Sequence, residues 1–242
     1  MSKQDDLYSK PLEKPADFRF DERVVQVFPD MINRSVPGYA LIVPMIGLLA
    51  RRFVTPGSRV YDLGCSLGAC SLAIRRALSV EDVEIMAVDK SAAMVSRCQE
   101  LISADDAAIP VRVFEQDITD TEIQNASLVV LNFTLQFLTP EKRTALLKKA
   151  CRGMQTGGAL VLSEKVHFED ERKQELMTQW HHDFKKTQGY SDLEIAQKRN
   201  ALENIMIPEA LESHYDRLSS AGFREAHNWY RCFNFYSIIA IK

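Results

Sequence analysis

The sequence has no large excess of either charge, no Cys-x-x-Cys pair and no long hydrophobic run. Its 242 residues include 30 Lys+Arg and 33 Asp+Glu, a formal net charge of −3. This balance argues against a domain that binds the nucleic-acid backbone, because such domains are normally basic. The most apolar segment, residues 39–50, is shorter than the ~20 residues of a membrane-spanning helix and contains Pro44. We therefore expect no direct nucleic-acid binding and no membrane association.

The first residues and the cysteines favour a cytoplasmic protein. The segment MSKQDD has no apolar stretch behind a basic start, so no secretory signal is predicted. The five cysteines are odd in number and singly placed, which is typical of small buried apolar residues. The histidines show no metal-ligand spacing, and the adjacent His181 and His182 are predicted to be solvated or partner-facing. We expect no disulfide and no metal.

Hydrophobic periodicity predicts one α/β domain after a short N-terminal arm. Residues 1–20 are polar and are expected to form a loosely attached arm, and residues 21–242 a single domain. Two helices are predicted first, from Asp21 to about residue 35 and over 39–53. Short β-branched runs then alternate with amphipathic segments, as in a parallel sheet covered by helices. The predicted strands are 59–63, 83–88, 111–115, 127–131 and 159–163, and the predicted helices are 68–78, 92–103 and 141–154.

The remaining residues predict a helical insertion and a hairpin. Residues 169–206 are charged and helix-like, with a break at Gly189, and could form a lid over the sheet. After a helix over 209–221, the apolar runs 223–230 and 233–241 have no helix between them and should pair antiparallel. The predicted fold class is α/β: a doubly wound, Rossmann-like, seven-stranded sheet of five parallel-type strands and a C-terminal antiparallel hairpin, with N-terminal helices and a helical insertion.

Four predicted strands each end in residues suited to a nucleotide-like ligand. The glycines of the turn 64–68 let the backbone approach a ligand, and Asp89 stands at the spacing of a carboxylate that binds ribose hydroxyls. Asp117 could hold an adenine amino group, and Asn132 ends the fourth strand. Asp and Asn often end strands for local reasons, so only their joint placement indicates a site.

The turn after the first strand resembles that of the class I S-adenosylmethionine-dependent enzymes. Their pattern is D-x-G-x-G-x-G, and here Asp62 precedes the first glycine while Ser66 replaces the middle one. These enzymes also end in an antiparallel pair, and residues 157–164 resemble their fifth strand. The resemblance covers about residues 55–242 and implies the class I methyltransferase fold.

A hydrolase is an alternative interpretation of the same turn. G-x-S-x-G is also the nucleophile-elbow pattern of α/β-hydrolases, with Ser66 as nucleophile and His214 or His227 as base. The elbow needs earlier strands to supply an oxyanion-hole loop, whereas this turn follows the first predicted strand. The position of the turn therefore argues against a hydrolase.

Several stretches outside the turn are similar to the carboxy-S-adenosyl-L-methionine synthase family. They are residues 20–30, 34–39, 61–66, 131–138, 197–204 and 231–235, and the match runs from about residue 17 onward. In that family S-adenosylmethionine and prephenate give carboxy-S-adenosylmethionine and phenylpyruvate, and a partner enzyme uses the product to carboxymethylate wobble uridine in tRNA. The resemblance implies a transferase with prephenate as its small-molecule substrate and a functional link to a tRNA carboxymethyltransferase.

The same resemblance implies where S-adenosylmethionine, or bound carboxy-S-adenosylmethionine, is held. Arg199 would bind the added carboxylate, to which a guanidinium can donate two hydrogen bonds, and is the one residue assigned a catalytic role. Lys90 stands where asparagine is expected in the family, which leaves that contact to the backbone or to a shifted position. The implied contacts are Tyr39, Gly64, Cys65, Ser66, Asp89, Lys90, Asp117, Ile118, Asn132 and Arg199.

Residue patterns alone leave other interpretations open. Tyr39 lies in an apolar run and could be a core residue, and Arg199 could belong to a solvated helix face. The chain could be a plain methyltransferase acting on tRNA or a small molecule, although residues 132–135 lack the prolines of the N-P-P-Y motif. It could also be a non-catalytic carrier of its cofactor. Aromatic-rich helices favour a homodimer, which leaves open whether Arg199 acts in its own chain or across a subunit boundary.

Overall fold

The computed structural model describes residues 3–13 and 17–242, which build a doubly wound α/β fold. The strands are β1 (Arg59–Leu63), β2 (Glu84–Asp89), β3 (Val111–Glu115), β4 (Ala126–Asn132), β5 (Met154–His167), β6 (Glu209–Ala210), β7 (Glu225–Cys232) and β8 (Phe235–Ile241). They pair in the order β3-β2-β1-β4-β5-β8-β7, and β6 adds to β5. β1 to β5 run parallel, and β8 is antiparallel to both β5 and β7. The predicted fold class is confirmed, with β6 as one further short strand.

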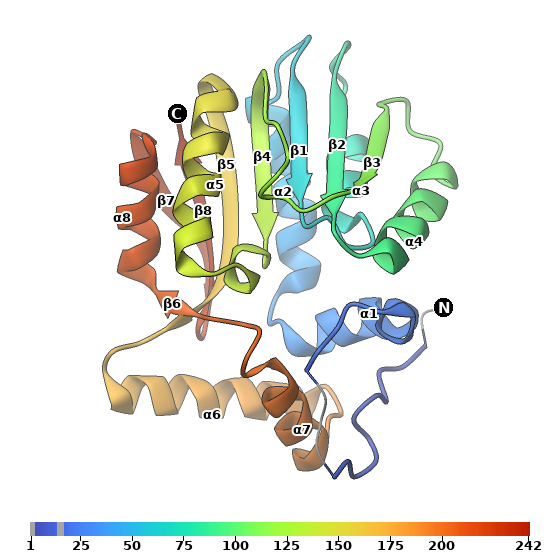
Figure 1. The fold of residues 1–242 in the computed structure, drawn as a ribbon, viewed down its shortest axis with the longest axis vertical. Coiled ribbons are helices and arrows are strands. Elements are labelled where there is room, and N and C mark those ends of the chain that lie inside the picture. Colours follow the sequence, from blue (N-terminus) through green and yellow to red (C-terminus); the bar gives the residue numbers. More distant parts are fainter. Residues whose placement is uncertain (1–2, 14–16) are drawn as a thin grey trace.

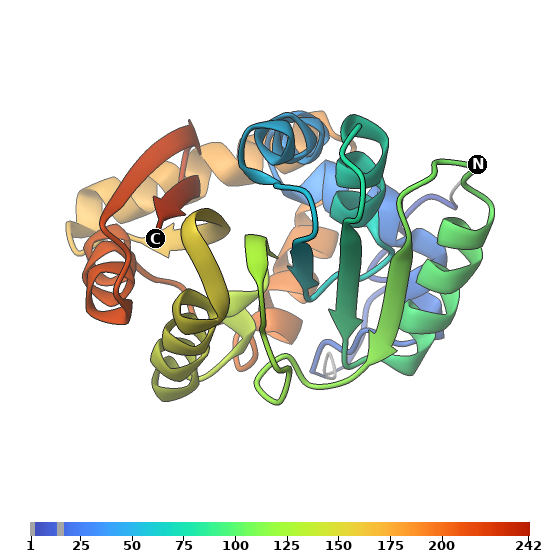
Figure 2. The ribbon, with the colours of Figure 1, turned by 90° about the horizontal axis from the view of Figure 1, so that it is seen from above.

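Helices cover both faces of this sheet and one of its ends. They are α1 (Glu22–Ser35), α2 (Tyr39–Phe53), α3 (Ala69–Ala77), α4 (Ala92–Ser103), α5 (Pro140–Gly153), α6 (Glu171–Thr187), α7 (Asp192–Leu202) and α8 (Leu211–Ala221), with the 3-10 helix η1 (Leu135–Phe137). Figure 2 shows α2 and α3 on one side of the sheet and α5 on the other. In Figure 1, α1, α6 and α7 lie below the ends of the strands.

Two apolar layers hold the helices on the sheet. On one face, Val60 of β1 packs with Ile46 of α2 and Ile74 of α3, all three fully buried. On the other face, Leu131 of β4 packs among residues of α5 and α8, including Leu147. Strands in the middle of a parallel sheet are buried on both faces, which explains why β4 reads as an almost continuous apolar run.

Local signals fix most of the element boundaries. Asp21 caps α1, because its Oδ1 accepts hydrogen bonds from the backbone N–H groups of Arg23 and Val24, each at 3.1 Å. Gly68 precedes α3 at φ +79°, a left-handed conformation that glycine adopts without strain. The predicted ranges of α2, β1, α4 and β3 agree with the structure residue for residue.

The last two strands begin two residues later than predicted, at Glu225 and Phe235. Two further differences arise because tertiary pairing overrides local signals. The predicted helix 141–154 and strand 159–163 leave residues 155–158 between them, but these residues lie inside β5, which begins at Met154. Gly157 takes φ +80° where the β4–β5 register shifts, and glycine at this position accommodates the irregularity within the strand. Glu209 was expected to begin a helix, but it pairs with Val166 of β5, and its carboxylate forms an ion pair with Arg217 at 2.6 Å.

The N-terminal arm is held to the domain in its described part, which corrects the expected loose attachment; residues 1–2 and 14–16 lie outside the described residues. Asp5 is only 2% exposed. Its backbone N–H donates to Asp30 Oδ2 at 2.7 Å, and its carboxylate accepts from Tyr190 Oη and from Lys198 Nζ, the latter at 3.3 Å. Leu12 N–H donates to the α7 side chain of Gln197. The arm therefore ties α1 to α7.

The helices of residues 3–13 and 17–242 include no single one that is long and apolar enough to cross a membrane. The pair α1 and α2 has that length and apolarity only when taken together, and it is bent by 95°.

Replacing Asp5 with alanine should destabilise the fold. The change leaves Lys198 buried without its counter-ion, which typically costs about 3 kcal/mol of unfolding free energy. Chemical denaturation would measure this loss. The exposed neighbour Asp6 provides the control, and Asp6→Ala should stay close to the unmodified protein. Equal stability of the two variants would contradict the anchoring role of Asp5.

Candidate active site

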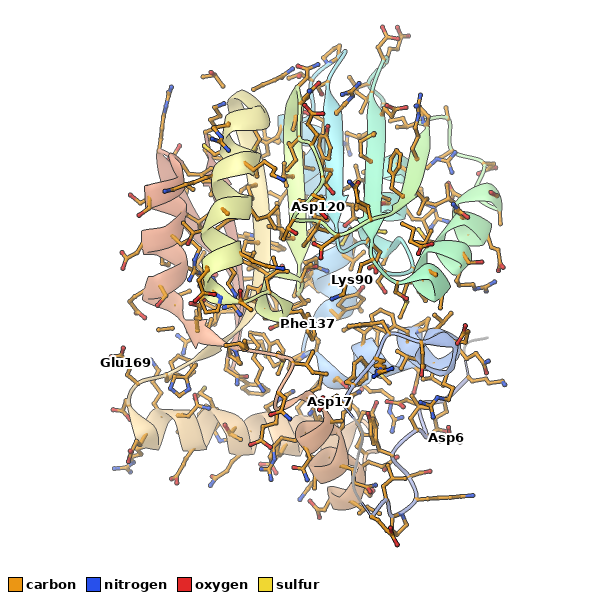
Figure 3. All side chains as sticks on the ribbon, in the orientation of Figure 1. Asp6, Asp17, Lys90, Asp120, Phe137 and Glu169 are labelled. Carbon is orange, nitrogen blue, oxygen red and sulfur yellow. The ribbon has the colours of Figure 1, made fainter. Side chains whose placement is uncertain are left out.

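One large cavity lies where the carboxyl ends of the parallel strands face α1, α6 and α7. Its volume is about 1050 Å³. The chain order reverses between β1 and β4, and open α/β sheets bind ligands at such a switch point. Figure 3 shows Lys90 and Phe137, two of the lining residues, between the sheet and the helices beneath it. All ten residues to which the sequence assigned ligand contacts line this cavity: Tyr39, Gly64, Cys65, Ser66, Asp89, Lys90, Asp117, Ile118, Asn132 and Arg199.

The turn after β1 brings backbone close to the cavity. Gly64 has φ +79°, and a Cβ there would lie 2.3 Å from Thr134 Cγ2. Ser66, which replaces the middle glycine of the motif, also takes a positive φ, +50°. The backbone N–H of Ser66 donates to Asp89 Oδ2 at 2.9 Å, which fixes the turn against the end of β2. Residue 66 therefore keeps the left-handed backbone conformation that the middle glycine of the motif would favour.

Two carboxylates at neighbouring strand ends face the cavity. Asp89 also accepts from Ser91 N–H at 2.9 Å, so each of its oxygens has one backbone donor and a lone pair left for a ligand hydroxyl. Burial raises the pKa of Asp89, against the effect of these hydrogen bonds. Burial also raises the pKa of Asp117, but donation from Thr119 and the charges of Lys142 and Lys90 outweigh it, so the net shift is downward. Lys90 is exposed, and its charge favours the ionised form of both acids.

Two more polar groups complete the sheet side of the cavity. Asn132 Oδ1 at the end of β4 is buried without a hydrogen-bond partner among the described residues, so it can accept from a ligand. Asp62 accepts from Ser71 N–H at 3.0 Å and from Ser71 Oγ at 2.6 Å. These two hydrogen bonds hold the turn against the start of α3. Burial nonetheless raises the pKa of Asp62 to about 6.

Tyr39 and Arg199 reach the cavity from the helical side. Tyr39 begins α2, and its half-buried ring lies 6.4 Å from that of Phe133, so it both packs on the core and lines the cavity. Arg199 is exposed at the cavity wall, whereas the adjacent Lys198 is buried and paired with Asp5. The face of α7 that carries Lys198 and Arg199 is therefore not purely solvated. Lys198 is buried, and Arg199 is exposed but also lines the cavity.

A polar face of α6 was missed by the sequence analysis. Its signal is a helical spacing of polar residues, obscured by the high charge of the whole segment. His181 is buried rather than solvated, and its Nε2 lies 2.8 Å from the Ser35 carbonyl oxygen. Burial holds the pKa of His181 well below its ordinary value. The face comprises Gln174, Thr178, His181, His182 and Lys185, and Lys165 of β5 also lines the cavity.

The hydrolase alternative is not supported by the position of Ser66. Its Oγ donates to Met94 Sδ at 3.4 Å rather than to a base. His214 is buried, and burial lowers its pKa to about 4. Neither His214 nor His227 lines the cavity.

The glycine turn, the strand-end acids and the antiparallel strand pair define a class I S-adenosylmethionine-dependent methyltransferase fold. Residues 60–158 match the family model described as a methyltransferase domain. Among solved structures, human N-acetylserotonin methyltransferase in complex with S-adenosylmethionine is 18% identical at a TM-score of 0.62, covering 91% of this chain and 55% of that one. An O-methyltransferase family protein from Burkholderia thailandensis is 16% identical at a TM-score of 0.65, covering 92% and 60%.

Sequence relatives identify the family within this class. The carboxy-S-adenosyl-L-methionine synthase of Escherichia coli (strain K12) is 55% identical over 242 residues, which is 100% of this chain and 98% of that protein. The enzyme of the same name from Escherichia coli O1:K1 / APEC shows the same identity and coverage. The chain belongs to the carboxy-S-adenosyl-L-methionine synthase family.

Replacing Gly64 with alanine should weaken binding of S-adenosylmethionine by at least about 10-fold. The added methyl group would clash with Thr134 at the turn. Gly57→Ala is the matched control, because Gly57 has a similar φ of +70° but no atom of the described residues lies within 4 Å of the position of an added Cβ. Isothermal titration calorimetry on both variants separates the clash from backbone strain, and equal affinities would contradict the proposed crowding.

Proposed function

We propose that this chain converts S-adenosyl-L-methionine and prephenate to carboxy-S-adenosyl-L-methionine and phenylpyruvate. The observation that carries the proposal is a cavity that brings acids and cations together. Asp89 ends β2 and Asp117 follows β3, while Lys165 near the end of β5, Lys185 of α6 and Arg199 of α7 supply cations to the same cavity. Such a cavity suits a cationic nucleoside together with an anionic acid. The 55% identity to carboxy-S-adenosyl-L-methionine synthases supports the same reaction.

The residues present fit S-adenosylmethionine at the sheet side. Asp89 retains acceptor capacity for ribose hydroxyls, Ile118 offers an apolar surface beside Asp117 for the adenine, and the unpartnered Asn132 Oδ1 can accept from the ligand. Gly64 lets the turn pack closely against Thr134, where a Cβ would lie 2.3 Å from Thr134 Cγ2. These residues bind and orient the nucleoside.

Between the two substrates, carbon dioxide passes from the ring carbon of prephenate to the S-methyl carbon of S-adenosylmethionine, while the methyl proton and the prephenate hydroxide leave as water. The chain contributes positioning and exclusion of water. Arg199 can donate two hydrogen bonds to the transferred carboxylate and so hold it beside the sulfonium without placing an unbalanced cation there. Phe20 helps to close the cavity, with its ring 5.5 Å from that of Phe137.

We also propose that the chain acts as a homodimer and passes its product to a tRNA carboxymethyltransferase. Exposed apolar side chains on α6 and α7 support the first part, with Trp180 exposed by 44% and Leu193 by 39%. The net charge of −3 supports a division of labour in which the partner handles the tRNA.

Isotope labelling tests the reaction. With prephenate labelled in its ring carboxylate, the label should appear in the nucleoside product, because that carboxylate is the proposed source of the transferred group. Mass spectrometry of the nucleoside fraction measures it. Formation of unlabelled carboxylated product would exclude this route, methylation of an acceptor would favour a plain methyltransferase, and binding without turnover would favour a carrier.

Replacing Arg199 with methionine should weaken the binding of carboxy-S-adenosylmethionine but not that of S-adenosylmethionine. Affinity for carboxy-S-adenosylmethionine should fall by at least about 10-fold, since a hydrogen bond to a charged group contributes about 1.5–3 kcal/mol. Affinity for S-adenosylmethionine should change little, because it lacks the carboxylate. Calorimetric titration of both ligands checks this, with Arg172→Met on the exposed side of α6 as the control. An equal loss for both ligands would contradict carboxylate recognition by Arg199.

A further inference from the structure

Two lysines face the cavity from different elements. Lys165 lies near the end of β5, where its backbone N–H donates to Gln136 Oε1 at 3.1 Å, and Lys185 lies on the cavity face of α6. Both side chains are largely buried. Within residues 3–13 and 17–242, neither ammonium group has a hydrogen-bond or ion-pair partner, and no acid contributes to either pKa.

Two other lysines nearby, Lys198 and Lys186, are paired within the protein itself. Lys198 is paired with Asp5 and hydrogen-bonds to Ser35 Oγ at 2.9 Å. Lys186, the next residue along α6, is exposed and pairs with Asp192 at 2.7 Å. Lys165 and Lys185 differ from both, because their charge is unbalanced within the described part of the chain. A buried cation without a counter-ion is costly, and an anion in the cavity would remove that cost.

We propose that Lys165 and Lys185 form a second carboxylate subsite, which holds the 2-oxo acid end that prephenate shares with phenylpyruvate. The inference rests on the proposed function. In that reaction prephenate brings two carboxylates and gives up only the one on its ring. Arg199 of α7 serves the transferred carboxylate, so the retained one needs cations of its own. Lys165 and Lys185 supply them from β5 and α6, with Gln136 beside them.

The charges around this subsite predict its pH dependence. Burial, as the main cause, lowers the pKa of Lys165 to about 8 and that of Lys185 to about 7. For Lys185 the charges of Lys165, Lys198 and Arg199 add to the effect. The cavity face of α6 also presents His181 and His182, whose pKa values are lowered, first by burial, so both are neutral near pH 7.

A carboxylate binds only the protonated lysines, so its arrival should raise both pKa values and draw protons onto the protein. Affinity should be highest below about pH 7 and should fall as the pH rises through about 8.

Phenylpyruvate is the probe, because it carries the retained carboxylate and lacks the transferred one. Titration into the full chain loaded with S-adenosylmethionine should give a Kd that rises at least about 10-fold in Lys165→Met and in Lys185→Met. Lys186→Met is the matched control and should leave that Kd unchanged. Lys165→Arg keeps the charge and should retain most of the affinity. The S-adenosylmethionine affinity of each variant, measured in the same way, reports whether the site remains intact.

The outcomes separate this inference from the proposed function. Unchanged phenylpyruvate affinity in both methionine variants would overturn the subsite, even if the unmodified protein turns over prephenate. Absence of a carboxylated product from the unmodified protein would instead overturn the proposed function. If one variant fails to fold, the other variant and the unmodified protein still decide, because a Kd that stays flat from about pH 6 to about pH 9, without proton uptake, contradicts the subsite.

Discussion

Parallel pairing of β1 with β2 on one side and with β4 on the other is the constraint on which the site depends. It brings the carboxyl ends of β1, β2 and β4 to one edge of the sheet, and β3 adds its own end beside β2. Residues far apart in the sequence, such as Gly64, Asp89 and Asn132, therefore line one cavity. The hydrogen bond from Ser66 N–H to Asp89 stabilises this arrangement, because it joins the turn after β1 to the end of β2.

The helical layer below the sheet supplies cations to the cavity, Lys185 from α6 and Arg199 from α7. Packing of the insertion helices against α1 depends on Asp5, which links the N-terminal segment to Tyr190 and to Lys198 of α7. That contact neutralises one cation of the layer and leaves others free to face a ligand. The cavity thus combines acids at the strand ends with cations from α6, α7 and the end of β5, an arrangement that suits two substrates of opposite charge.

The sequence was sufficient to predict most elements and to select strand-end residues that line the cavity, for identifiable physical reasons. Local signals are strong there: Asp21 is a helix cap, Gly64 and Gly68 are turn residues, and β-branched runs mark the strands. The longer β5 and the pairing of Glu209 with Val166 escaped prediction, because they depend on strand partners distant in sequence. The cations of α6 escaped for a related reason. Whether a charged helical residue faces solvent or a cavity is decided by the element on which the helix packs.

Mass spectrometry of the small molecule that co-purifies with the protein tests the central claim most directly. A chain that makes carboxy-S-adenosylmethionine and holds it through Arg199 should retain a nucleoside heavier than S-adenosylmethionine by one carbon dioxide. Recovery of S-adenosylmethionine or its demethylated product alone, from cells that contain prephenate, would contradict the account.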